Sequence, residues 1–133
     1  MVERLVRRRR TILWGSFIGY GLFYGGILLK EGFAPGSTGA VIVSAISLGG
    51  WVVWVASIVR ARLLGRGVPL QARRALVDEL WRANVMRSMA FAFWAMLALQ
   101  VIAVLTRLQR APELTIYVGV MTALGAFLYL DRE

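Results

Sequence analysis

Few side chains in this sequence are suited to catalysis or metal binding, because it contains no cysteine and no histidine. The missing thiolates and imidazoles are the usual ligands of zinc, copper, haem iron and iron–sulfur clusters. A serine nucleophile would need a histidine or lysine base, and Lys30 is the only lysine. No GxxxxGK[ST] phosphate-binding motif is present. The sequence therefore predicts a protein that is not an enzyme and holds no metal or cofactor.

The polar residues inside apolar segments are uncharged, and Gln100 is the most polar of them. An amide in hydrocarbon needs a hydrogen-bond partner. Gln100 is therefore predicted either to clasp a neighbouring serine, threonine or tyrosine or to line a polar pathway. Ser44 and Ser47 carry the same two interpretations, although a serine hydroxyl can also bond to the backbone of its own helix.

Four apolar runs position these residues: 11–29, 40–59, 88–106 and 114–130. None of the runs contains Asp, Glu, Lys or Arg. Roughly 20 helical residues cover a hydrocarbon core about 30 Å thick, so runs of this length are typical of membrane spans. With 59% hydrophobic residues, the chain is predicted to be all-α: an integral membrane four-helix bundle of two helical hairpins, within a single transmembrane domain over 1–133.

The segment between the second and third runs is the longest stretch outside them. From Pro69 onward it has good helix formers, and a helix is predicted over 69–87 that continues into the third span. This helix is expected to lie on anionic lipid headgroups, to pair with a second copy, or to bind a cytoplasmic protein. The candidate contact residues are Leu76, Leu80, Trp81, Arg73 and Arg74.

Basic residues are distributed unevenly around the spans. Thirteen lie in the first ten residues, the middle segment and the C-terminus, whereas three, Lys30, Arg107 and Arg110, lie in the other connectors. The excess of basic residues on cytoplasmic loops predicts a multi-pass protein of a bacterial inner (plasma) membrane with both termini in the cytoplasm. Because the basic residues flank apolar runs instead of gathering on a soluble face, the net charge of +9 does not indicate nucleic-acid binding.

Small residues line one face of each predicted span, where helix backbones can approach closely in lipid. The predicted seams are Gly15, Gly19 and Gly26 on the first span, Ala45, Gly49 and Ala56 on the second, Ser88, Ala92 and Ala95 on the third, and Gly119, Ala123 and Ala126 on the fourth. They are expected to hold the four helices together. The other interpretation is that one seam, first of all the Gly15 to Gly19 face, docks on a second copy or on another membrane protein.

In length and number of spans the chain resembles the small multidrug resistance transporters, which act as dimers and use a carboxylate in the first span for proton coupling. There is no carboxylate between Glu3 and Glu31, so proton-coupled export is not expected. The expected function is that of a non-enzymatic accessory or regulatory membrane protein, in a homo-oligomer or a larger membrane complex, with a cytoplasmic protein as a further partner. The alternative is a small homo-oligomeric transporter or channel with an uncharged polar path through Gln100 and the serines.

Overall fold

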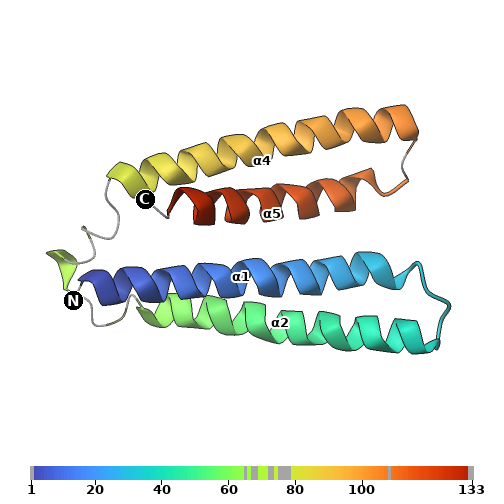
Figure 1. Ribbon diagram of the computed structural model, residues 1–133, viewed down its shortest axis with the longest axis horizontal. Coiled ribbons are helices and arrows are strands. Elements are labelled where there is room, and N and C mark those ends of the chain that lie inside the picture. The colour runs from blue at the N-terminus through green and yellow to red at the C-terminus, as the bar shows by residue number, and fades with distance from the viewer. Residues whose placement is uncertain are drawn as a thin grey trace. The chain divides into compact units, whose positions relative to one another are not determined.

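The computed structural model describes residues 2–64, 66, 69–71, 74, 79–107 and 109–131. Its main elements are the helices α1 (Val2–Lys30), α2 (Thr38–Leu64), α4 (Glu79–Thr106) and α5 (Ala111–Leu130) (Figure 1). By length and composition, all four are long and apolar enough to cross a membrane. The all-helical class predicted from the sequence is therefore confirmed for the described residues, and the helices suggest a multi-pass membrane protein.

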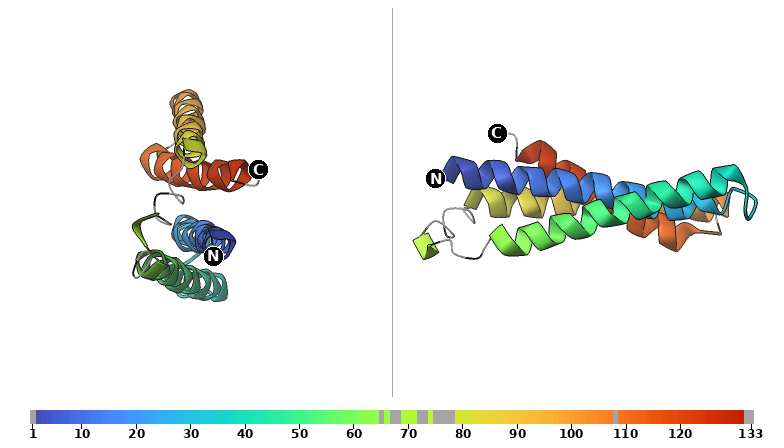
Figure 2. Two further views of the ribbon diagram at one scale, coloured as in Figure 1. Left: turned by 90° about the vertical axis from the view of Figure 1, so that its left-hand side faces the viewer. Right: turned by 90° about the horizontal axis from the view of Figure 1, so that it is seen from below.

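The chain divides into two compact units, Met1–Asp78 and Glu79–Glu133. Helix α1 packs along α2 in the first unit, and α4 packs along α5 in the second. Figure 2 shows each pair from two further directions. The two pairs are described separately below, and a single four-helix bundle stays a prediction.

The turn between α1 and α2 follows from its glycine and serine. Gly36 has a φ of 76°, in the left-handed region that glycine adopts without steric cost. Ser37 then caps α2, because the backbone N–H of Ala40 donates to the Ser37 hydroxyl at 3.2 Å. Chain reversal within these few residues allows α2 to return along α1.

Helix α1 contacts α2 through its glycine face. A Cβ atom built on each glycine meets α2 atoms: Gly15 meets Ser57, Gly19 meets Gly50 and Trp54, and Gly26 meets Ser47. Residue numbers that rise along α1 pair with numbers that fall along α2, so the helices are antiparallel. The Gly15 to Gly19 face therefore packs within the chain, and the prediction that this face docks on another molecule is not supported.

The α2 side of this contact differs from the seam that the sequence suggested. Ala45, Gly49 and Ala56 are exposed, and no atom lies within 4 Å of a Cβ built on Gly49. The buried residues of α2 are Ala40, Ser47, Gly50 and Ser57. Two of the residues that face α1 are serines, which are nearly as small as alanine. The choice of glycine and alanine alone on this span therefore selected a face turned by about 130°.

Helix α4 begins at Glu79, nine residues before the predicted start of the third span at Ser88. The last part of the predicted cytoplasmic helix is therefore continuous with that span. Of the candidate contact residues in this segment, Arg73 and Leu76 lie outside the described residues, and Leu80 is described only by its place in α4. Arg74 is exposed.

The second pair also packs through small residues. Ala92 and Ala103 of α4 are buried, as is Gly119 of α5. A Cβ on Gly119 would strike the side chain of Met96, so this glycine makes room for the methionine. Of the remaining predicted seam residues, Ser88 is buried, and Ala95, Ala123 and Ala126 are half-buried.

We expect Gly19→Ala to destabilise the first pair, since the new Cβ would lie 2.6 Å from the backbone nitrogen of Trp54 and 2.9 Å from the backbone oxygen of Gly50. Overpacking of this kind costs about 1–3 kcal/mol. Gly49→Ala is the matched control, because its Cβ meets open space and alanine favours the helix by up to about 1 kcal/mol. Thermal unfolding in detergent, followed by circular dichroism, should give a lower Tm for the first variant only. An unchanged Tm for Gly19→Ala would contradict the described contact.

Candidate functional site

The serines predicted inside the spans have hydrogen-bond acceptors on the backbone. The Ser44 hydroxyl donates to the Ala40 carbonyl of its own helix at 2.7 Å. The Ser47 hydroxyl instead crosses to α1 and donates to the Phe23 carbonyl at 2.7 Å. Ser47 therefore joins the two helices, whereas Ser44 satisfies its hydroxyl locally.

Ser57 lies beneath Gly15 in the same helix contact. Its hydroxyl donates to the Val53 carbonyl at 2.8 Å, and the residue is buried. A Cβ on Gly15 would collide with the Ser57 oxygen. The missing side chain at Gly15 therefore provides the space in which this hydroxyl lies.

Gln100 is bonded to the neighbouring helix. Its amide nitrogen donates to the Thr115 hydroxyl of α5 at 2.8 Å, and that hydroxyl donates to the Ala111 carbonyl at 2.6 Å. The three groups form a chain from the C-terminal part of α4 to the first turn of α5. This is the geometry expected of a clasp to a neighbouring threonine, and it uses one of the two amide hydrogens that a polar pathway would offer to a passing molecule.

At the opposite end of the second pair, Asn84 makes a bond that the sequence did not reveal. Its amide donates to the Leu130 carbonyl at 3.1 Å, and only 3% of the residue is exposed. The last carbonyls of a helix have no partner within it, so Asn84 satisfies one of those of α5. Asn84 lies 46 residues before Leu130 in the sequence, so its partner could not be identified there.

Trp81 packs against α5. Its ring lies 6.1 Å from that of Phe127 in an edge-to-face arrangement, and Phe127 is only 6% exposed. The sequence predicts that Trp81 contacts lipid headgroups, a second copy or a cytoplasmic protein, and this stays a prediction. Because α5 continues to Leu130 and covers this part of α4, the half-buried ring also contributes to the helix pair.

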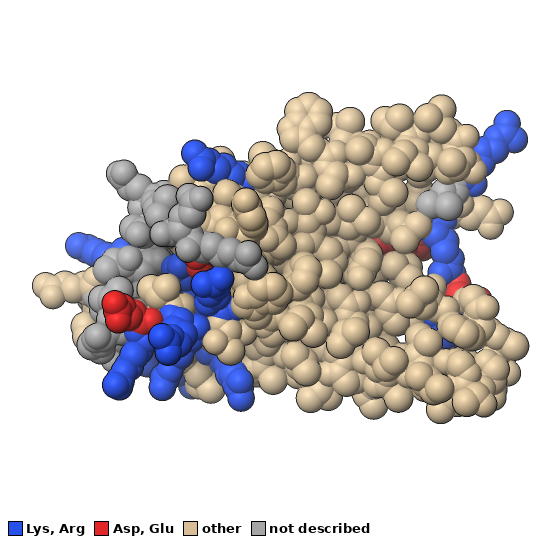
Figure 3. Space-filling view, in the orientation of Figure 1, with Lys and Arg blue, Asp and Glu red and all other residues tan. Residues whose placement is uncertain are grey.

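The antiparallel arrangement of the first pair gathers arginines at one end. The N-terminal part of α1 lies beside the C-terminal part of α2, which brings together Arg4, Arg7, Arg8, Arg9, Arg10, Arg60 and Arg62. Figure 3 shows basic side chains gathered at the end of this pair where the chain begins. Lys30 lies at the other end of α1. The first unit therefore has a strongly basic end and a weakly charged end.

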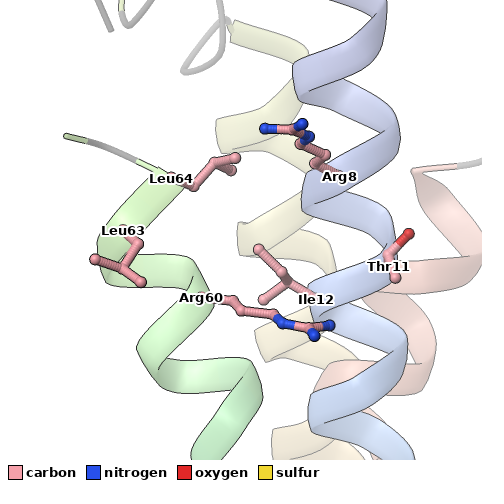
Figure 4. Close-up of a pocket in the computed structure, with 6 residues that line it drawn as sticks. All are labelled: Arg8, Thr11, Ile12, Arg60, Leu63 and Leu64. Atoms are coloured by element: carbon pink, nitrogen blue, oxygen red, sulfur yellow. The ribbon is translucent and has the colours of Figure 1, made fainter. Parts of the chain in front are cut away.

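A cavity of about 390 Å³ opens between α1 and α2 at the basic end. It is lined by Arg8, Thr11, Ile12, Arg60, Leu63 and Leu64 (Figure 4). Arg8 extends from α1 toward α2, and Arg60 extends from α2 toward α1, with Ile12 between them. No sequence motif could reveal this site, because its two arginines come together only through the helix register.

We expect the Gln100–Thr115 bond to stabilise the second pair by about 0.6 kcal/mol, the average for such bonds between membrane helices. The coupling is measured with Gln100→Leu, Thr115→Val and the double variant, by unfolding in detergent. Ser44→Ala is a control that removes a hydroxyl bonded only to its own helix. Additive effects of the two single substitutions would show that the bond contributes nothing.

Within the described residues, no three His, Cys, Asp or Glu side chains gather closely enough to hold a metal ion.

Searches of protein-family models, curated protein sequences and solved structures found no match, so similarity assigns this chain no family and no activity.

Proposed function

We propose that this chain is a non-enzymatic accessory or regulatory protein of the inner (plasma) membrane, which acts through helix contacts with other membrane proteins. It crosses the bilayer four times as two hairpins, with both termini in the cytoplasm. The partner is another membrane subunit or a second copy of the chain, and a cytoplasmic protein is a further candidate.

The outward faces of the helices support a location in lipid. On α4, Phe91 is 57% exposed, Trp94 66% and Leu105 78%. Continuous apolar surface of this kind costs about 25 cal/mol per Å² in water, and large exposed apolar patches mark protein or membrane contacts. In a bilayer the same faces meet lipid tails at no such cost.

The basic end of the first pair supports the orientation. Its arginines are joined in sequence to the middle segment, which holds further arginines, whereas Lys30 is accompanied by Glu31 at the other end. Basic residues are retained on the cytoplasmic side of membrane proteins. Both ends of the first hairpin therefore lie in the cytoplasm in this proposal.

The accessory role rests on one observation, which is that α2 has two small-residue faces and α1 covers only one. The face of Ser47, Gly50 and Ser57 packs on α1, while Gly49 faces open space between Ala45 and Ala56. A second helix can approach closely at such a face, and close approach favours association in lipid. We assign the Ala45 and Gly49 part of this face to the partner helix, because Ala56 lines a cavity next to α1.

The transporter alternative has less support. A polar path requires polar groups that can exchange hydrogen bonds with a passing solute or ion. Instead, the Gln100 amide donates to Thr115 and the Ser47 hydroxyl donates to Phe23, so both groups hold helices together. Ser44 and Ser57 bond to carbonyls of their own helix.

The topology is tested by cysteine labelling, for which the cysteine-free sequence provides a clean background. Single cysteines replace Pro35 and Gln109 in the two short connectors and Gln71 in the middle segment. A membrane-impermeant maleimide added to intact cells should label the first two positions, while Gln71→Cys should react only after the cells are opened. The reverse pattern would refute the proposed orientation.

The accessory role is tested by purification in a gentle detergent followed by mass measurement. We expect a second membrane protein, or a second copy, at a fixed stoichiometry. Gly49→Leu should reduce its recovery about tenfold, because overpacking of about 1–3 kcal/mol prevents the close approach. Ala98→Leu, on an exposed position of α4, is the control and should leave recovery within about twofold.

One further result would replace this proposal by the transporter alternative. If Gln100→Leu abolishes solute flux into reconstituted vesicles while assembly and Tm are retained, the amide has a transport role. If the variant alters only the Tm, Gln100 is a structural clasp, as the Thr115 bond suggests.

A further inference from the structure

The cavity at the basic end of the first pair continues into a groove along the two helices. A second cavity of about 300 Å³ shares Thr11, Ile12 and Arg60 with the first. Beyond these shared residues it is lined by Gly15, Val52, Val53, Ala56 and Ser57. The combined groove therefore begins between two arginines and leads along an apolar track toward the middle of the helices.

The two arginines carry charge that no described side chain neutralises. Helix α2 contains no Asp or Glu, and between Glu3 and Glu31 α1 contains none either. Neither Arg8 nor Arg60 has an ion-pair partner among the residues that the structure describes. Guanidinium groups bind phosphate through paired N–H donors, so this end of the groove favours a phosphate-bearing ligand.

The rest of the groove offers few hydrogen bonds. The Thr11 hydroxyl donates to the Arg7 carbonyl at 3.1 Å, and the Ser57 hydroxyl donates to the Val53 carbonyl. The remaining lining beyond the arginines consists of aliphatic side chains and glycine. A small phosphate ion would use only the arginine end, whereas a lipid would use the arginines and the apolar track together.

The position of the two arginines along the helices also matches the depth of a phospholipid headgroup in a bilayer. Arg8 lies three residues before the first apolar run, at 11–29, and Arg60 directly follows the second run, at 40–59. Both residues therefore fall at the boundary between the apolar part of the pair and its charged end. In a bilayer the phosphates of phospholipids lie just outside the hydrocarbon core, at this level.

We propose that Arg8 and Arg60 bind the phosphate of an anionic phospholipid, whose acyl chain lies in the groove along Ile12, Val52 and Ala56. This inference rests on the proposed location of the chain in a membrane. Two neighbouring arginines favour a lipid with net negative charge, such as phosphatidylglycerol, over zwitterionic phosphatidylcholine, because the choline would add a positive charge to the site.

The charge requirement is tested by adding phosphatidylglycerol to the full chain in detergent and counting bound lipids by native mass spectrometry. Arg8→Gln and Arg60→Gln should each lower the affinity about fivefold, the effect of losing one basic residue near an anionic lipid. Arg4→Gln and Arg62→Gln remove the same charge at the same end without lining the cavity. They should stay within about twofold of the wild type, and an equal loss in all four variants would refute a defined site.

The acyl-chain contact is tested with Ala56→Phe, which fills the groove without changing charge. This variant should reduce phosphatidylglycerol binding at least fivefold. Ile46→Phe is the control and should not, because Ile46 is exposed, lines neither cavity and lies about three helical turns away on α2. Inorganic phosphate serves as the competitor for the arginines alone. If it displaces the lipid at equal concentration, the ligand is a soluble phosphate. If Ala56→Phe binds the lipid normally, the acyl chain does not lie in the groove. Either result would refute the lipid proposal.

Misfolding and failure of membrane insertion are distinguished from loss of the site. Arg8→Lys and Arg60→Lys keep the charge but lose the paired N–H donors, so they should bind phosphatidylglycerol more tightly than the Gln variants and less tightly than the wild type, with the same helical content by circular dichroism. Variants that fail to bind lipid but show the wild-type cysteine-labelling pattern have lost only this site. A wild-type chain that binds phosphatidylglycerol in detergent but is not inserted in cell membranes would refute the proposed location alone.

Discussion

The close approach of α1 and α2 at Gly19 and Gly50 determines how the first unit is built. A Cβ on Gly19 would lie 2.6 Å from the Trp54 nitrogen, and one on Gly50 would lie 2.7 Å from the Leu22 side chain. Because neither helix has a side chain at this point, their backbones can meet, and the meeting fixes the register between them. The register brings Ser47 to the Phe23 carbonyl and places Arg8 beside Leu64.

The second unit reaches a similar arrangement through polar bonds near its ends. The Gln100–Thr115 bond lies toward one end of the pair, and the Asn84–Leu130 bond lies at the other. Between them, Ala92 and Gly119 allow close packing with little side-chain volume. In the proposed membrane location the helices would gain nothing from hydrophobic burial, so small residues and a few hydrogen bonds would provide much of the stability of both pairs.

The sequence predicted the four helices well, because uninterrupted apolar runs of span length have few other interpretations. The glycine face of α1 was also accessible from residue spacing, and the polarity of Gln100 predicted a bond to a neighbouring hydroxyl as one of two interpretations. The face of α2 that packs on α1 could not be identified in this way. The serines of α2 were treated as polar, although they pack like small residues. The Trp81–Phe127 contact and the arginine-lined cavity depend on where α5 ends and on the register of α2, and neither can be read from local sequence.

Helix α1 continues without a break through Arg7–Arg10. Successive residues of an α-helix are turned by about 100°, so these four side chains point in all directions around the helix and do not lie on one face. In the proposed bilayer location, a shift of α1 toward the hydrocarbon would draw all four arginines toward a region where a charged side chain is costly. These arginines would therefore limit the depth of the first helix pair, whatever the rotation of the helix.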